Sequence, residues 1–428
     1  MHCCIVACVR SARIFVGLAA FCWISLAAGA PLTLQEAWSL AEKANPAFRA
    51  VQAESATAEG RLAESRAPLF NNPAVSLESW RGKTPQAIPP ADRESDWRTG
   101  LSQTFEIAGQ QSRRREAAEH DIAAIGANIA DARAQLRAEV EQRFIQVLAL
   151  QLRSSVERET VSLIEQAADT VRKRREAGQV SRLDANLARV EAERARNVLN
   201  QLSEQLTQAR AELAALLQLP AGELPEVTGQ LRRAAAYTLE ELLDAASRRQ
   251  RLVGLTRREE AARSRLELER AARYPDVTLG VFTGREGPAV LRQNIVGLSV
   301  ALPLPLFRRN EAGVGRAVTE LTQAQIERQA AERDIAAGVR AQWQRVAQLQ
   351  ARADRLREAV LPALEDNRRL SQTALREGEI GIAEVLLVNR QVAEATRDAL
   401  DAESELRRAR IELERAAGWL PADMRDGK

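Results

Sequence analysis

The side chains that most often carry chemistry are scarce in this sequence. The four cysteines all lie within the first 30 residues, at Cys3, Cys4, Cys8 and Cys22. Beyond that segment the chain offers one histidine, His120, and one methionine, Met424. Transition-metal sites need clustered Cys, His or Met side chains, so we expect neither a bound metal nor another cofactor.

Catalytic constellations are missing as well. The sequence contains no Ser/His/Asp arrangement, no glycine-rich loop suited to phosphate, and no carboxylate pair isolated enough for acid–base catalysis. The formal net charge is +3 over 428 residues, with acids and arginines intermixed. Nucleic-acid binding would need clustered basic charge. We therefore predict a protein that is not an enzyme and does not bind nucleic acid.

Two acids remain as candidates, because each follows a glycine at the same distance. Asp184 lies six positions after Gly178, and Glu384 lies six positions after Gly378, in segments that resemble each other. A glycine between two helical stretches favours a turn, and an acid in the first turn of a helix interacts well with its dipole. Each segment therefore predicts a helical hairpin whose tip lies near the glycine.

These two segments belong to an internal duplication with an offset of about 200 positions. Thr33-Leu-Gln-Glu matches Thr238-Leu-Glu-Glu, and either Thr can cap a helix that carries Glu at its third position. We divide the chain into a first repeat over 31–230 and a second over 231–428. Each repeat is expected to read helix, two strands, long helix, glycine turn and return helix.

The return helices carry apolar residues in alternating steps of four and three, which predicts a seam that packs along another helix. The two copies keep one register. The first seam is Ala188, Ala192, Ala195, Leu199, Leu202, Leu206, Ala209, Leu213 and Leu216, and the second is Val388, Val392, Ala395, Ala399, Ala402, Leu406, Ala409, Leu413 and Ala416.

Alternating residues predict a β-hairpin in each repeat, at about 73–106 and about 275–302. The four strands have about ten residues each, the length that a tilted strand needs to cross a bilayer. Since membrane barrels need at least about eight strands, several subunits would have to share one barrel. Trp80 and Trp97 then fit an interfacial aromatic belt. The alternative is a small soluble sheet that caps a helical bundle.

Long helical stretches over about 108–177 and 309–377 follow the hairpins, and each would span on the order of 100 Å. At the second junction, Pro303 and Pro305 cannot donate to a strand ladder. We expect the last strand to end there and the chain to redirect into the next helix.

The N-terminus has the features of a secretory signal peptide over residues 1–30. Basic Arg10 and Arg13 precede an apolar run from 14 to 26, and small residues follow it. The alternatives are a retained anchor helix and a lipid-modified Cys22, but Phe21 does not provide the small residue that lipidation needs before the cysteine.

The sequence resembles the TolC-like outer membrane factor family, and within it the CzcC-type members of cation-efflux systems. The resemblance rests on Leu32-Thr-Leu-Gln-Glu-Ala, Asn72-Pro73-Ala-Val, Leu101-Ser-Gln-Thr-Phe-Glu106, Tyr274-Pro275-Asp, and the segment from Gly297 to Asn310. It implies a mainly α-helical chain with four strands, three copies of which form a twelve-stranded transmembrane β-barrel. It further implies an α-helical tunnel across the periplasm, and a location in the outer membrane lipid of a Gram-negative cell.

The resemblance also implies partners and site residues. The expected partners are a periplasmic adaptor and an inner-membrane pump, with Gly178 and Gly378 at the tips where the adaptor docks. Asp184 and Glu384 match acids of the tip region, and in three chains they would give a ring of six carboxylates. The alternative for each acid is a role limited to starting the return helix.

We therefore expect a passive channel of a tripartite efflux system that exports heavy-metal cations. A channel for organic drugs or secreted polypeptides is the alternative within this class. From a different class, a periplasmic coiled-coil scaffold without a pore fits the same helices.

Overall fold

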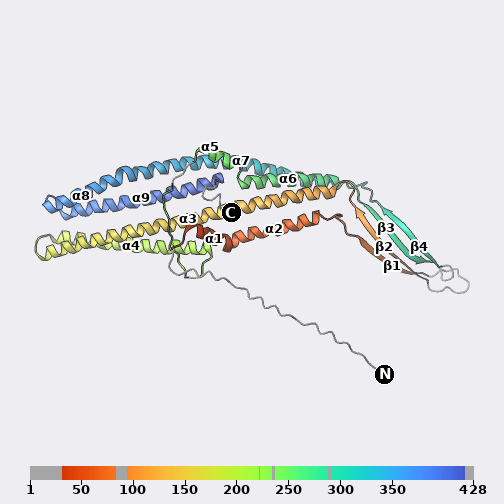
Figure 1. Cartoon of the computed structure of the whole chain (residues 1–428), viewed down its shortest axis with the longest axis horizontal. Coiled ribbons are helices and arrows are strands. Elements are labelled where there is room, and N and C mark those ends of the chain that lie inside the picture. The colour runs from red at the N-terminus through yellow and green to blue at the C-terminus, as the bar shows by residue number, and fades with distance from the viewer. Residues whose placement is uncertain (1–30, 83–93, 221, 234–236, 288–291, 420–428) are drawn as a thin grey trace, which may run out of the picture.

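The chain is elongated, with a β-sheet at one end and two helical hairpin tips at the other (Figure 1). The structure is a computed structural model that describes residues 31–82, 94–220, 222–233, 237–287 and 292–419. The predicted signal peptide with its four cysteines lies outside the described residues, as does Met424.

The first half of the chain contributes four helices and two strands. In chain order they are α1 (Leu34–Ala44), α2 (Pro46–Ser65), β1 (Ala74–Gly82), β2 (Glu94–Phe105), α3 (Gln110–Glu176) and α4 (Arg182–Leu217). The second half repeats this order. Its elements are α5 (Leu239–Ser247), α6 (Gln250–Ala271), β3 (Val277–Glu286), β4 (Gln293–Ala301), α7 (Glu311–Arg355), the π-helical turn η1 (Leu356–Val360), α8 (Leu361–Glu377) and α9 (Ile382–Ala417).

The predicted capping boxes are confirmed at the first helix of each half. The Thr33 backbone N–H donates to Glu36 Oε2 at 2.9 Å, and the Thr238 N–H donates to Glu241 Oε2 at 2.7 Å. One difference from the predicted order is that each of these helices is split in two. Pro46 explains the first split, because the residue before a proline is driven out of the helical region and Asn45 is extended at φ −62° and ψ 120°.

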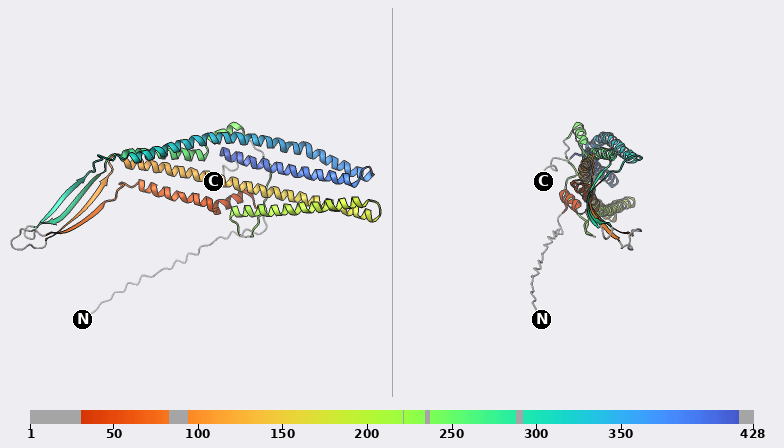
Figure 2. Two further views of the ribbon diagram at one scale, coloured as in Figure 1. Left: turned by 180° about the vertical axis from the view of Figure 1, so that it is seen from behind. Right: turned by 90° about the vertical axis from the view of Figure 1, so that its right-hand side faces the viewer.

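The long helices carry the chain from the sheet to the tips, and shorter helices accompany them in two stretches. Helices α4 and α9 return from the tips only to the middle of the body, where α1, α2, α5 and α6 continue toward the sheet (Figures 1 and 2). Helix α3 is unbroken over 67 residues. The second long helix instead contains the π-helical turn η1, which ends two residues before Pro362. A proline lacks the N–H of the helical ladder, and its ring crowds the carbonyl four residues earlier.

The heptad seams are the buried faces of α4 and α9. Most seam residues are buried, including Leu213 and Leu413 at 0% exposure, while Leu199, Leu216, Val388 and Ala416 are half-buried. Two apolar cores form in the middle of the body, one among α1, α3 and α4 and the other among α5, α7 and α9. The sequence pattern therefore gave the correct packing face of both return helices.

Ion pairs join the two halves of the chain along α3 and α9. Glu157 of α3 is 1% exposed at its side chain and accepts from Arg397 Nη2 at 2.8 Å. Farther from the tips, Glu141 pairs with Arg407, and both side chains are 6% exposed. Separating the partners of an ion pair this deeply buried leaves an uncompensated charge, which is costly. These contacts therefore fix the register of one repeat against the other.

Candidate functional site

Both hairpin tips end in a left-handed glycine. Gly178 has φ +77° and Gly378 has φ +78°, a region that residues with a Cβ rarely adopt. The N–H of Gln179 donates to the Arg174 carbonyl at 2.8 Å, and the N–H of Glu379 donates to the Ala374 carbonyl at 2.9 Å. This is the Schellman pattern of a helix C-terminus. The geometry therefore places the predicted glycines at the turns of the two tips.

The two acids after these turns are helix caps. Asp184 Oδ2 accepts from the Ser181 backbone N–H at 3.3 Å, and the Ser181 hydroxyl accepts from the Asp184 N–H at 3.1 Å. Glu384 Oε2 accepts from the Gly381 N–H at 2.7 Å. Each acid is the third residue of its return helix, where it satisfies a backbone donor that the helix leaves unpaired. Both acids therefore cap their helices within a single chain, whereas a function at a channel aperture stays a prediction.

The two tips also contact each other. Leu386 at the start of α9 packs into a small apolar cluster with Val171 of α3 and Ala188 of α4. Arg390 lies 3.9 Å from Glu191 across the same contact. On the outside of α4, exposed apolar residues recur at helical spacing, at Leu183, Leu187 and Val190. This exposed stripe is a surface that sequence analysis missed, although its four-and-three spacing was readable.

At the opposite end, the four strands form one antiparallel sheet in the order β1-β2-β3-β4. The register pairs Val75 with Leu101, Leu101 with Val281, and Val281 with Leu298. Side chains directly opposite each other share a face, so a row of apolar side chains crosses all four strands on one face. The exposed large apolar side chains of this face, which we call the apolar face, are Val75, Leu77, Trp97, Leu101, Leu279, Val281, Val296, Leu298 and Val300.

The other face of the sheet carries mostly polar or small side chains, with Trp80 and Phe282 among them. We call it the polar face, and its residues include Ser76, Glu78, Asp96, Arg98, Gly100, Ser102, Gly280, Gly297 and Ser299. A Cβ at Gly297 would collide with the Phe282 ring, which lies across this face. The Arg98 guanidinium carbon lies 5.0 Å from the centroid of Phe282 and 5.6 Å from that of Trp80, within the range of cation–π attraction.

The register separates the two tryptophans that were predicted to share one interfacial belt. Trp80 pairs with Asp96 and lies on the polar face, whereas Trp97 pairs with Ser79 and lies on the apolar face. Successive residues of a strand point to opposite sides, so Ser79 and Trp80 lie on different faces. Trp97 is directly opposite Ser79 and therefore shares its face and not that of Trp80. The two tryptophans therefore cannot belong to a belt on one face, and an interfacial function stays a prediction for each of them.

The junction between β4 and α7 contains both predicted prolines. Strand β4 ends at Ala301, two residues before Pro303. The N–H of Leu306 donates to the Leu304 carbonyl at 2.8 Å, which closes a three-residue turn around Pro305. Asn310 then starts α7 in the left-handed region at φ 60°. The chain therefore redirects over the residues where the prolines predicted it.

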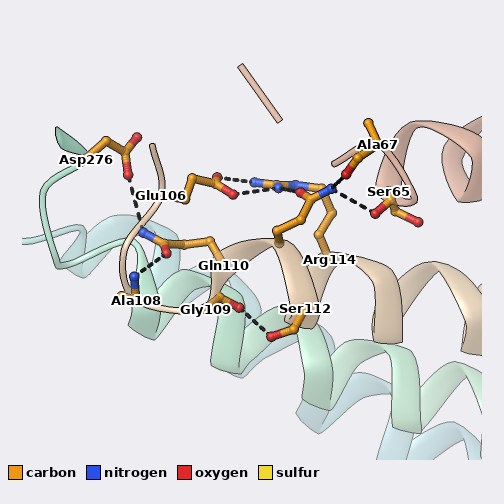
Figure 3. Close-up of polar contacts among 10 residues, drawn as sticks. Ser65, Ala67, Glu106, Ala108, Gly109, Gln110, Ser112, Arg114 and Asp276 are labelled. Carbon is orange, nitrogen blue, oxygen red and sulfur yellow. Dashed lines mark hydrogen bonds and ion pairs between the residues drawn. The ribbon is translucent and has the colours of Figure 1, made fainter. Parts of the chain in front are cut away.

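The matching junction between β2 and α3 is held by a polar clasp that sequence analysis missed (Figure 3). Arg114 Nη2 donates to Glu106 Oε1 at 2.7 Å, and the guanidinium carbon of Arg114 lies 3.5 Å from the centroid of the Phe70 ring. The Gln110 side chain donates to Asp276 Oδ1 at 3.4 Å. Burial, and then the nearby Glu106 carboxylate, raise the pKa of Asp276. The clasp ties α3 to the start of β3, and its sequence signal was only a Glu and an Arg on either side of a glycine.

Within the described residues, no group of three or more His, Cys, Asp or Glu side chains is placed to hold a metal ion. His120 contacts Glu260, with 3.1 Å between Nδ1 and Oε2. In the same part of the chain, no helix is long and apolar enough to cross a membrane.

The fold and its two ends define a class of protein. A single four-stranded sheet exposes an apolar face, and its two outer strands, β1 and β4, each have one strand neighbour. Two long hairpins extend from that sheet to glycine-marked tips (Figure 1). Such a chain has the form of one subunit of an elongated channel.

Comparison with known proteins assigns the family. The model of the outer membrane efflux protein family matches residues 37–218 and again residues 242–419. The chain therefore belongs to the outer membrane efflux protein family, is not an enzyme, and carries the family unit twice.

Individual relatives agree with this assignment. The chain is 28% identical over 374 residues to the cobalt-zinc-cadmium resistance protein CzcC of Cupriavidus metallidurans, covering 86% of this chain and 85% of that protein. The outer membrane protein VceC of Vibrio cholerae has a similar fold, with a TM-score of 0.72, 18% identity, and coverage of 90% and 96%. The open state of the Neisseria gonorrhoeae MtrE outer membrane channel gives a TM-score of 0.73, 20% identity, and coverage of 90% and 88%.

Proposed function

We propose that three copies of this chain form the outer-membrane duct of a tripartite efflux system that exports heavy-metal cations. The observation that carries the proposal is the four-stranded sheet, whose apolar face is exposed and whose outer strands each have one strand neighbour. Apolar surface of this extent is stable in lipid, and unpaired strand edges in lipid are costly. Three sheets joined edge to edge solve both problems in a shared twelve-stranded barrel.

The polar face of the sheet would then line the pore, and the helical body would continue the duct below the membrane. The partners in this proposal are a periplasmic adaptor that docks at the tips and an inner-membrane pump that supplies the energy. Gly178 and Gly378 shape the docking tips, and the exposed stripe of Leu183, Leu187 and Val190 offers an apolar surface to adaptor helices.

Metal cations are the proposed cargo because the relative CzcC is a cobalt-zinc-cadmium resistance protein. The side chains that line the duct would let the ion pass rather than hold it at a binding site. The described residues hold no metal-binding cluster, and a conduit needs only weak contacts with its cargo. Organic drugs and secreted polypeptides remain the competing cargoes, and a deletion strain sensitive to dyes but not to zinc, cobalt or cadmium would favour them.

A pair of neighbouring substitutions tests the channel. Leu77 and Ser76 are adjacent in β1 and point to opposite faces, Leu77 being 77% exposed on the apolar face. An arginine facing lipid near the middle of a strand costs about 2–4 kcal/mol, whereas an arginine facing the pore remains in water. We expect Leu77→Arg to deplete the heat-modifiable trimer from outer-membrane fractions, and Ser76→Arg to assemble normally with altered conductance in planar bilayers.

Equal assembly of the two variants would argue against a lipid-facing sheet. A wild-type protein that purifies as a monomer and gives no conductance would support the periplasmic scaffold instead.

A further inference from the structure

An exposed apolar segment between β4 and α7 is not explained by the channel pore or by the tips. Apolar residues occupy every second position from Val296 to Leu306, and the last three of them, Leu302, Leu304 and Leu306, lie beyond the end of the strand. Leu304 is 68% exposed and Leu306 is 67% exposed. Phe307, which follows, is 95% exposed. Exposed apolar side chains therefore continue along the chain past the end of the last strand.

Basic side chains follow this segment immediately. Arg308 and Arg309 are exposed, as is Arg273 at the end of α6. Hydrogen bonds from the backbone N–H groups of Glu311 and Arg309 lower the pKa of Glu311, and the nearby positive charges of Arg273 and Arg309 add to this shift. The Arg309 N–H donates to Glu311 Oε2 at 3.0 Å, and Asn310 Nδ2 donates to the Glu269 carbonyl at 2.9 Å, so the start of α7 with Arg309 lies beside the end of α6 with Arg273.

Tyr274, next to Arg273 in the chain, is 64% exposed and contributes an aromatic ring with a polar end. Such rings favour the boundary between lipid and water. We call Tyr274, Leu304, Leu306, Phe307, Arg273, Arg308 and Arg309 the junction collar. Along the chain, the collar changes from fully apolar to fully basic between positions 307 and 308.

We propose that the junction collar binds anionic phospholipid at the periplasmic surface of the outer membrane, with the apolar residues among the acyl chains and the three arginines on the phosphate groups. This inference rests on the proposed function, because only a membrane-crossing sheet brings the collar to that boundary. The abrupt change from apolar to basic matches the change from acyl chain to headgroup in a bilayer. Arginine is suited to phosphate because its fork of donors binds two oxygens at once.

The choice of an anionic lipid follows from the charge of the collar. Arg308 and Arg309 directly follow Phe307, and Arg273 lies at the neighbouring end of α6, so three exposed arginines gather at this junction. Clustered basic residues beside a membrane attract anionic lipids. A bilayer of zwitterionic lipid would satisfy the apolar residues equally well but would leave this charge without a counterion. Phosphate in solution would satisfy the charge but not the apolar residues.

The test uses the purified full-length trimer and three probes: short-chain phosphatidylglycerol, short-chain phosphatidylcholine and inorganic phosphate. Bound lipids are counted by native mass spectrometry over a titration. We expect a clear preference for phosphatidylglycerol in the wild type. Arg273→Gln/Arg308→Gln/Arg309→Gln should weaken phosphatidylglycerol binding about tenfold or more and leave phosphatidylcholine binding unchanged.

Two further variants separate the contributions. Arg340→Gln/Arg345→Gln removes two exposed charges from the middle of α7 and should bind both lipids like the wild type. Leu306→Ser/Phe307→Ser should weaken both lipids while keeping the preference for the anionic one.

The inference is overturned if the triple arginine variant binds phosphatidylglycerol like the wild type, if the wild type binds both lipids equally, or if inorganic phosphate displaces the lipid at equal concentration. These outcomes are distinct from a failure of the proposed function, because that failure would appear as a protein absent from outer-membrane fractions whatever its lipid preference.

Discussion

Each of the four candidate residues at the tips has a structural function that one chain already explains. The two glycines supply positive φ angles that end a helix, and the two acids cap the helix that follows. A function in the channel must therefore be tested with two kinds of substitution. One kind keeps the turn and the cap, and the other kind changes only the turn or only the cap.

Valine at both tip glycines should disturb the turns alone. At φ +77° and +78° a β-branched side chain strains the backbone by about 1–3 kcal/mol. Nothing lies within 4 Å of a Cβ added at either glycine, so the rest of the chain is not displaced. We expect Gly178→Val/Gly378→Val to form heat-modifiable trimers but to lose metal tolerance in a complemented deletion strain.

The matched control is Gly338→Val in the middle of α7, where the added Cβ also meets no neighbour within 4 Å and the backbone is helical. This variant should behave like the wild type. Normal export by the double tip variant would contradict the assignment of the tips as docking sites.

Isosteric substitutions separate capping from charge at Asp184 and Glu384. Asp184→Asn/Glu384→Gln keeps an oxygen that can accept from the backbone N–H and removes the negative charge, whereas Asp184→Ala/Glu384→Ala removes both. If the six carboxylates of a trimer line the aperture, the amide variants should lower cation selectivity in planar bilayers. If the acids only cap their helices, the amide variants should conduct like the wild type and the alanine variants alone should lose about 1 kcal/mol of stability at each tip.

At the scale of elements, the contact between α3 and α9 depends on buried ion pairs as well as on the alanine-rich seam. The hydrogen-bonded carboxylate of Glu157 raises the pKa of Arg397, which is half-buried. Removing one partner of such a pair leaves a charge with poor solvation. The seam alone would allow α9 to slide by one heptad, whereas the Glu157–Arg397 and Glu141–Arg407 pairs are satisfied in one register only.

Glu157→Ala should therefore destabilise the helical body by about 3 kcal/mol, measured as the loss of helical circular dichroism on urea titration. Asp401→Ala is the control, because Asp401 pairs with Arg153 across the same two helices at 3.3 Å but is 50% exposed at its side chain. An exposed pair contributes about 0–1 kcal/mol. Equal effects of the two substitutions would show that burial of the Glu157 pair does not hold the helices together.

At the scale of the whole molecule, stability depends on the region where helices of both halves meet. Burial, and then the neighbouring Glu141 carboxylate, raise the pKa of Glu414 above its usual 4.5. The Tyr237 hydroxyl donates to Glu414 Oε1 at 3.3 Å, and burial is also the main reason that the pKa of Tyr237 is raised. Arg407 and Arg233 favour the charged form of Glu414 but do not reverse the shift.

The consequence for pH follows from the direction of the shift at Glu414. The folded protein holds this proton more tightly than the unfolded chain, so ionisation disfavours folding. This cost is absent below the unfolded pKa of 4.5 and complete above the raised folded pKa. We expect Glu414→Gln to raise the thermal midpoint at neutral pH and to leave it nearly unchanged at about pH 4. Glu394→Gln, at an exposed position on the same helix, should change the midpoint little at either pH.

The fold could be predicted from the sequence to a large extent because its main signals are local and periodic. The 4-3 spacing fixed which faces of 182–217 and 382–417 are buried, and alternation located the four strands. The capping boxes and the tip glycines were readable because the contacts that they make span three to five residues. The duplication was visible for the same reason, because it repeats these local patterns at an offset of about 200 positions.

Other features were decided only by tertiary structure, because they depend on which distant residues meet. The opposite faces of Trp80 and Trp97 follow from a strand register that neither hairpin sequence states. The Glu157–Arg397 pair joins residues 240 positions apart, and the clasp at Asp276 joins two different hairpins. The carboxylates at the tips, which the sequence marked as candidates for the aperture, are used as helix caps within each chain. The sequence alone determined the duplicated helical hairpins with their four strands. Strand register and packing across the two repeats determined which side chains share a face of the sheet and which pair with each other, since burial and charge pairing act between residues that lie far apart in the chain.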